Sequence, residues 1–126
     1  MKKKILLVDD EKDTLLVIGK RIITWGYDLI EASSGKEAIS AVKTKNPDIV
    51  ILDYKLPDID GIAALKDIRK INKTVPVIMF TAFPDAKSIT DSEQLGICAY
   101  VPKTNILSPA ESSLKAAIHI AEGVKK

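Results

Sequence analysis

Residues 48–61 read DIVILDYKLPDIDG and combine an apolar run with a polar loop. The apolar run, Ile49–Leu52, lies between Pro47 and a loop rich in proline, aspartate and glycine. Such a run is typical of a strand buried on both faces of a parallel sheet. Asp53 follows directly, and a carboxylate at the end of a buried strand is costly unless its charge is compensated. Asp53 is therefore either a turn residue in water or a working group at the strand's carboxyl end.

Strands and helices alternate along the rest of the chain, which predicts a parallel sheet covered by helices on both faces, the α/β class. The expected strands are Ile5–Val8, Tyr27–Ala32, Ile49–Leu52, Val75–Phe80 and Ala99–Pro102. The expected helices are Lys12–Trp25, Ser33 or Ser34 to Lys45, Gly61 onward, Pro84–Gly96 and Ser108 onward. The polar alternation of the second strand and Pro102 in the fifth predict that these two strands lie at the edges.

Two of the helices differ in how clearly their buried faces can be assigned. The first has an apolar face at helical spacing, formed by Leu15, Leu16, Ile18, Ile22 and Ile23. The fourth is polar, and only Ile89 and Leu95 are expected to point inward. We therefore expect the fourth helix to be the most weakly packed of the five.

The composition excludes several classes of protein. A length of 126 residues, 46% of them hydrophobic and 29% charged, predicts one globular domain over residues 1–126. A net charge of +2 gives no reason to expect nucleic-acid or membrane binding. Cys98 is the only cysteine, which excludes a disulfide framework and a thiolate metal cluster. No signal peptide or transmembrane stretch is visible in the sequence. We expect a cytoplasmic location.

Polar side chains follow four of the expected strands at one edge of the sheet. They are Asp9, Asp10, Asp53, Thr81 and Lys103. Three converging carboxylates repel one another, and Mg²⁺, which prefers oxygen ligands, relieves that repulsion. The hydroxyl and the ammonium complement an anion. A nucleophilic carboxylate, a metal ion, a hydroxyl and a lysine are together what phosphoryl transfer onto a carboxylate requires.

This set of residues, together with Tyr100 and the segment 53–61, resembles the receiver domains of two-component response regulators, including the chemotaxis-regulator-like ones. The resemblance covers essentially the whole chain. It implies a flavodoxin-like doubly wound fold with a five-stranded sheet in the order 2-1-3-4-5. It also implies that Asp53 accepts a phosphoryl group from a sensor histidine kinase or a phosphotransfer protein.

The resemblance further implies a metal site. Asp10, supported by Asp9, would bind Mg²⁺ together with Asp53 and the backbone carbonyl of Lys55.

The same resemblance assigns catalytic and switch residues. Thr81 and Lys103 would contact the phosphoryl oxygens, and Tyr100 would turn inward when Thr81 moves. The face formed by the fourth helix, the fifth strand and the fifth helix would change as a result. The sequence departs from the family where Thr104 rather than proline follows Lys103, and a non-proline cis bond costs roughly 2.5–4 kcal/mol. We therefore expect a differently shaped loop there.

Several functions compete on this fold. A flavodoxin-like carrier needs a Ser/Thr/Gly-rich phosphate loop after the first strand, where this chain has three carboxylates. A dinucleotide-binding protein needs the motif Gly-x-Gly-x-x-Gly, and the glycines of this chain never come within that spacing. A dehalogenase-type phosphatase has aspartates two apart, whereas Asp9 and Asp10 are adjacent. The alternative is a receiver-like scaffold that works without phosphorylation. We expect no enzymatic activity beyond the chain's own phosphorylation and dephosphorylation, and a monomer or a weak phosphorylation-dependent dimer.

Two side chains are expected to set the lifetime of a phosphoryl group on Asp53. Lys55 lies two residues after Asp53, and Phe83 lies two residues after Thr81. Neither can orient an attacking water as a carboxylate or amide does. The sequence therefore predicts slow self-dephosphorylation.

Overall fold

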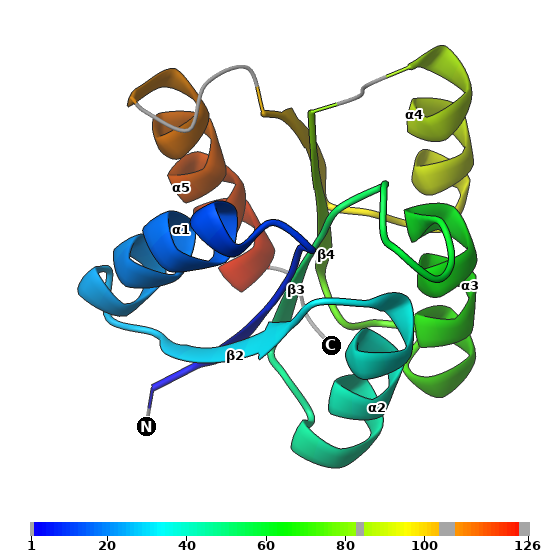
Figure 1. The fold of residues 1–126 in the computed structure, drawn as a ribbon, viewed down its shortest axis with the longest axis horizontal. Coiled ribbons are helices and arrows are strands. Elements are labelled where there is room, and N and C mark those ends of the chain that lie inside the picture. Colours follow the sequence, from blue (N-terminus) through cyan, green and yellow to red (C-terminus); the bar gives the residue numbers. More distant parts are fainter. Residues whose placement is uncertain (1, 83–84, 104–107, 124–126) are drawn as a thin grey trace.

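The computed structural model of the chain describes residues 2–82, 85–103 and 108–123. Strands and helices alternate as predicted, and each expected bound lies within two residues of the observed one (Figure 1). The strands are β1 (Lys4–Val8), β2 (Asp28–Ala32), β3 (Ile49–Leu52), β4 (Val77–Thr81) and β5 (Ala99–Pro102). The helices are α1 (Lys12–Thr24), α2 (Gly35–Lys45), α3 (Gly61–Ile71), α4 (Ala86–Gln94) and α5 (Ser108–Glu122).

The strands form one parallel sheet in the order β2-β1-β3-β4-β5, which confirms the predicted fold. β2 and β5 lie at the edges, as their sequences predicted. In the register, Leu52 of β3 pairs with Val8 of β1 and with Met79 of β4. The carboxyl ends of these three strands therefore meet at one edge, where ligands bind in sheets of this type.

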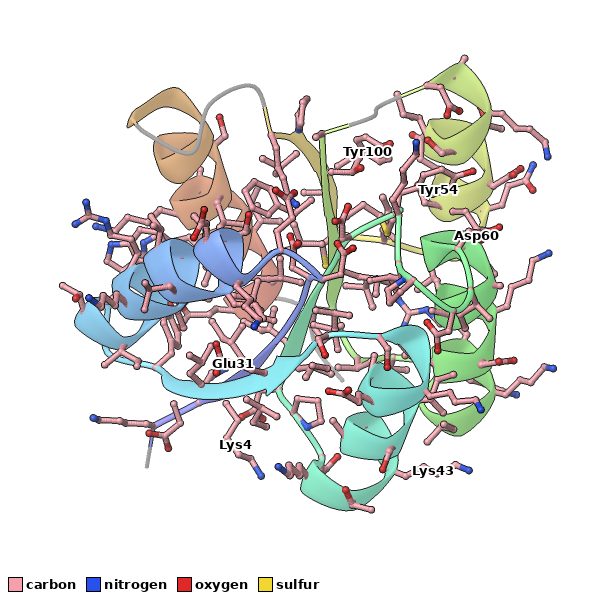
Figure 2. The ribbon with its side chains drawn as sticks, in the orientation of Figure 1. Lys4, Glu31, Lys43, Tyr54, Asp60 and Tyr100 are labelled. Carbon is pink, nitrogen blue, oxygen red and sulfur yellow. The ribbon has the colours of Figure 1, made fainter. Side chains whose placement is uncertain are left out.

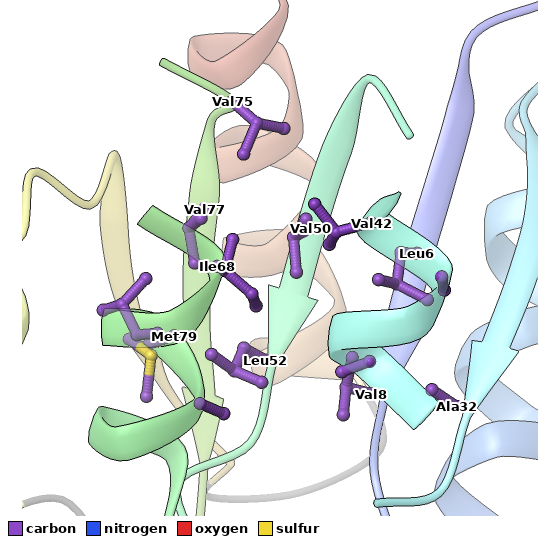
Figure 3. Packing of buried hydrophobic residues seen from close by; sticks show 14 residues of the cluster. Leu6, Val8, Ala32, Val42, Val50, Leu52, Ile68, Val75, Val77 and Met79 are labelled. Carbon is purple, nitrogen blue, oxygen red and sulfur yellow. The ribbon is translucent and has the colours of Figure 1, made fainter. Parts of the chain in front are cut away.

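Each face of the sheet has its own apolar core. Helices α1 and α5 cover one face and α2, α3 and α4 the other (Figure 1). On the first face, the larger buried side chains are Ile5, Leu7, Ile18, Ile22, Ile49, Ile51, Ile78, Phe80, Leu114 and Ile118. On the second face they are Leu6, Val8, Val42, Val50, Leu52, Leu65, Ile68, Val75, Val77 and Met79 (Figure 3). All of β3 is buried, because side chains from both faces cover it.

The turn after β3 requires glycine at position 61. A Cβ atom there would lie 2.4 Å from the Asp53 carbonyl oxygen and 2.6 Å from Cα of Tyr54. The Gly61 amide donates to the Tyr54 carbonyl, and Asp60 caps α3 by accepting from the Ala63 amide at 2.8 Å. This close approach fixes the first turn of α3 against the backbone of Asp53.

Two of the predicted apolar faces are wrong in part. Leu16 and Ile23 of α1 are 57% and 54% exposed, so the buried face of that helix is narrower than the sequence indicated. Ile89 on α4 is only partly buried, and the buried residues of that helix are Ser88 and Ser92. Because serine is polar, the spacing of apolar residues does not reveal that these two positions are buried. Leu95, just after the helix, is partly buried and packs against the core of the second face, as predicted.

Within the described residues, none of the helices combines the length and apolar character needed to cross a bilayer.

Candidate functional site

The ends of the strands bring the predicted residues to one edge of the sheet. Asp9 follows β1 and Asp53 follows β3, and their amides donate to Ala32 at 3.0 Å and Val8 at 3.1 Å, which continues the ladder beyond each strand. Thr81 ends β4, and its carbonyl accepts from the Lys103 amide at 2.7 Å. The backbone therefore sets how these side chains approach one another.

Three carboxylates converge at this edge, as predicted. Asp9, Asp10 and Asp53 each present an oxygen within 4.8 Å of the others. Asp9 and Asp53 are buried, with 1% and 5% of their surface exposed, whereas Asp10 is exposed. The cluster has a closed side formed by Asp9 and an open side formed by Asp10.

The Lys103 ammonium lies inside this cluster. It is hydrogen bonded to Oδ2 of Asp9, lies 3.2 Å from Oδ2 of Asp53, and lies 3.8 Å from the exposed Glu11 carboxylate. Its side chain is 5% exposed, and the ring centroid of Phe80 lies 5.5 Å from Nζ. A buried ammonium beside two buried carboxylates compensates the charge that burial makes costly.

The pKa values of this pair follow from burial and mutual attraction. Burial would lower the pKa of Lys103, but the hydrogen bond with Asp9 and the charge of Asp53 outweigh it and raise the pKa above its ordinary value. Burial raises the pKa of Asp9, and the hydrogen bonds from Lys103 and the Glu11 amide offset that rise only in part. Lys103 is therefore positively charged at neutral pH.

One oxygen of Asp53 is left without a partner. Its Oδ1 is buried and has no hydrogen-bond donor among the described residues, while Oδ2 faces Lys103. A buried carboxylate oxygen without a donor is costly, and a hard cation satisfies it. The orphaned oxygen and the all-oxygen ligand set of Asp9, Asp10 and Asp53 fit Mg²⁺.

The two predicted switch residues lie on the neighbouring strands β4 and β5. Thr81 is completely buried. Tyr100 lies on β5 beside α4, near Tyr54 (Figure 2), and its hydroxyl is 2.8 Å from Oγ of Ser88. Burial raises the pKa of Tyr100, and the bond with Ser88 opposes that rise. Tyr100 thus connects β5 to the first turn of α4.

Sequence reasoning missed Ser88 as the partner of Tyr100. The available signal was the pattern Asp85-x-x-Ser88, in which Asp85 caps α4 by accepting from the Ser88 amide at 2.7 Å. It also missed the role of Asp58, which accepts from the Gly35 and Lys36 amides at 2.8 and 3.0 Å. These bonds lower the pKa of Asp58 and fasten the loop after Asp53 to the start of α2.

Of the remaining predicted residues, the structure describes Lys55 but not Phe83 or Thr104. The Lys55 side chain lies exposed on the loop after Asp53. Phe83 and Thr104 lie outside the described residues, and so do the predictions that rest on them.

Comparison with known proteins gives one consistent family. Residues 5–118 match the family model of the response regulator receiver domain. The chain is 34% identical over 122 residues to the alkaline phosphatase synthesis transcriptional regulatory protein PhoP of Bacillus subtilis, which covers 97% of this chain and 51% of that protein. It is 34% identical over 103 residues to the sporulation initiation phosphotransferase F of the same species, which covers 82% and 83%.

Solved structures with a similar fold belong to the same family. A CheY-like response regulator receiver domain protein from Methanospirillum hungatei matches with a TM-score of 0.81 and 26% identity, over 97% of this chain and 96% of that one. The chain spans about half the length of several curated relatives that it matches.

Proposed function

Because this chain belongs to the response regulator receiver domain family, we propose that it is a signalling switch controlled by phosphorylation of Asp53. The observation that carries the proposal is the buried Asp53 carboxylate, held between Lys103 and the oxygens of Asp9 and Asp10. The donor would be a sensor histidine kinase or a phosphotransfer protein. The reaction breaks the phosphorus–nitrogen bond of a phosphohistidine and forms a phosphorus–oxygen bond to Asp53.

The chain's own groups support this transfer electrostatically. Lys103 is charged and already contacts Asp53, so it can donate to a phosphoryl oxygen without a large rearrangement. Thr81, at the end of the neighbouring strand, supplies a hydroxyl at the same edge. Receiver domains generally bind Mg²⁺ at an acidic pocket, and Asp9, Asp10, Asp53 and the carbonyl of Lys55 would hold it here. When bound, Mg²⁺ supplies neutralisation of the phosphoryl charge.

The switch would act through α4, β5 and α5. A phosphoryl group that engages Thr81 would change the surroundings of Tyr100, which lies on the adjacent strand in register beside Met79. The contact between Tyr100 and Ser88 would carry the change to α4.

The output is expected to lie outside this chain. The relatives include transcriptional regulators and a phosphotransferase. We propose that this chain forms a single receiver domain and binds no nucleic acid itself. Its only catalysis would be its own phosphorylation and dephosphorylation.

Intact mass spectrometry after incubation with acetyl phosphate and Mg²⁺ tests the proposal. The wild type should gain one phosphoryl group and the Asp53→Asn variant none. An equal gain in the variant would place the acceptor elsewhere, and no gain in either would favour a scaffold that works without phosphorylation.

Amide NMR is the right readout for Mg²⁺. Trp25 lies at the far end of α1, roughly 20 Å along the helix from the site, so its fluorescence is a poor reporter. The Asp10→Asn variant should bind Mg²⁺ more weakly than the wild type. Equal affinities would remove Asp10 from the ligand set.

We also propose that Lys55 and Phe83 slow the loss of the phosphoryl group. Lys55 is exposed on the loop beside Asp53, where its stem can cover the site. Phosphate release should be faster in Lys55→Glu and Phe83→Ala. Unchanged rates in both would refute this role.

A further inference from the structure

Within the described residues, helix α4 is joined to the rest of the molecule mainly at its two ends, by polar contacts and by Leu95, which packs against the core of the second face. None of its residues from Ala86 to Gln94 is a buried apolar side chain, and the two buried ones are Ser88 and Ser92. The second-face core is formed without them. The contacts that position α4 therefore lie at the two ends of the helix.

Arg69 of α3 holds the C-terminal end. Its Nε donates to the Leu95 carbonyl at 2.8 Å and its Nη2 donates to the Gly96 carbonyl at 3.0 Å. Its Nη1 donates to the Val75 carbonyl at 2.7 Å, in the connection between α3 and β4. No carboxylate lies within ion-pair distance of Arg69 among the described residues. The partners of the guanidinium in the described part of the chain are therefore backbone carbonyls.

The end of α4 is well suited to a cation. Gly96 has a φ of 74°, so the chain turns sharply there, and its amide and that of Leu95 donate back into the last turn. The carbonyls at a helix C-terminus carry the negative end of the helix dipole. The guanidinium of arginine spreads its donors over three nitrogens in a planar fork, which here reach two adjacent carbonyls and a third one, whereas an ammonium carries its three donors on a single atom.

The N-terminal end is attached to β5 by a neutral contact. Oγ of Ser88 lies 2.8 Å from the Tyr100 hydroxyl, and within the cap of α4 itself it donates to the Asp85 carbonyl at 3.1 Å. A hydrogen bond between two hydroxyls is weaker than one donated by a charged group. The two ends of α4 therefore differ in the strength of their attachment.

A pocket separates α3 and α4 near the Asp53 loop. Its volume is about 200 Å³, and its lining includes Tyr54, Asp60, Ala63, Lys87 and Asp91. Figure 2 shows Tyr54 beside α4 and Asp60 at the upper end of α3, where the two helices meet. The pocket thus separates the N-terminal ends of the two helices, next to the Asp53 loop, whereas Arg69 joins their C-terminal ends.

We propose that Arg69 is a positioning residue that fixes the C-terminal end of α4, so that only the first turns of α4 swing when the switch operates. The fixed end rests on the contacts of the resting protein, and the swing rests on the proposed function. Movement at the Ser88 end would change the pocket beside Tyr54, while Leu95 and Gly96 would stay in place.

Hydrogen exchange of the resting protein tests the fixed end by NMR. In Arg69→Gln, the amides of Leu95, Gly96 and Ile97 should exchange at least about tenfold faster than in the wild type, and Arg69→Lys should restore part of the protection. Lys70→Gln, the neighbouring exposed position on α3, is the matched control and should leave these amides unchanged. Equal rates in Arg69→Gln and Lys70→Gln would overturn the proposal.

The swing is tested in the folded wild type, which needs no variant. With Mg²⁺ and beryllofluoride, a phosphoryl mimic, exchange should change at Ser88 and Ile89 and stay constant at Leu95–Ile97. Equal changes at both ends would mean that α4 moves as a rigid body and would refute the swing. If beryllofluoride changes no amide at all, the proposed function fails, and the resting comparison of the Arg69 variants still decides the fixed end.

Discussion

Helices α3 and α4 lie on the same face of the sheet but are attached to it by different forces. Helix α3 buries Ile62, Leu65 and Ile68, and the last two have no exposed surface. Helix α4 buries two serines. Apolar burial is strong and holds a helix along its length, whereas hydrogen bonds hold it at single points. A helix of the second kind can change position at a lower cost than one of the first kind.

The largest expected effect comes from removing apolar volume on α3. Leu65→Ala should lower the free energy of unfolding by about 2–5 kcal/mol, because it leaves a cavity in a closed core. Ile89→Ala, the matched change on α4, should cost less than half of that, since Ile89 is only partly buried. Denaturant unfolding of both variants measures the difference, and equal losses would show that α4 is held by apolar packing after all.

The bond between Ser88 and Tyr100 should have a smaller, measurable energy. A double-mutant cycle with Ser88→Ala and Tyr100→Phe should give a coupling of about 0.5–1.5 kcal/mol, the usual net value of such a bond. Urea unfolding of the four proteins provides it. A coupling of zero would mean that the two hydroxyls are independent and that β5 is not tied to α4 at this point.

Ser92→Ala should change the free energy of unfolding by less than about 0.5 kcal/mol. The Ser92 hydroxyl donates to the Ile89 carbonyl of its own helix at 2.9 Å, and alanine has the higher helix propensity. The opposite change on α3, Ala64→Ser, places a hydroxyl in an apolar core and should cost more. Thermal unfolding compares the pair. A large loss in Ser92→Ala would give this serine a role beyond its own helix.

The smallest expected effect on the free energy of unfolding comes from the titration of Tyr54 and Tyr100 at alkaline pH. Burial and the charges of Asp60, Asp85 and Asp91 raise the pKa of Tyr54, and burial raises that of Tyr100. A raised pKa favours the neutral phenol in the folded state. The contribution to stability is therefore complete below pH about 10 and is lost as the pH rises further.

The ultraviolet absorbance of tyrosinate follows these titrations, and Tyr54→Phe and Tyr100→Phe identify each one. Tyr27, whose pKa is raised to about 12 by burial and by its bond to Glu122, is a control away from α4. Titration of Tyr100 at the value of free tyrosine would contradict the burial of its ring beside α4.

Helix α3 and the strand ends could be predicted from the sequence because each leaves a local signal. The spacing of Ile62, Leu65 and Ile68 gives one face of a helix, and an apolar run that stops at Asp53 gives a buried strand. Parallel strands end at one edge, so the approach of Asp9, Asp53 and Lys103 followed from their order alone.

The attachment of α4 could not be predicted in the same way. Its buried side chains are serines, and periodicity of apolar residues carries no information about hydrogen bonds. Arg69 reaches Gly96 across 27 residues, and Asp58 reaches Gly35 across 23, so neither pair has a local pattern. The exposed Leu16 and Ile23 show the converse, because apolar residues at helical spacing need not all face the core.

The close approach of Gly61 to the Asp53 backbone has a genetic consequence. Any side chain at position 61 would meet the Asp53 carbonyl or Cα of Tyr54 at less than 3 Å, so the backbone that presents the acceptor would have to shift. A search for unresponsive mutants should therefore recover changes at Gly61 alongside those at Asp53, although glycine carries no reactive group.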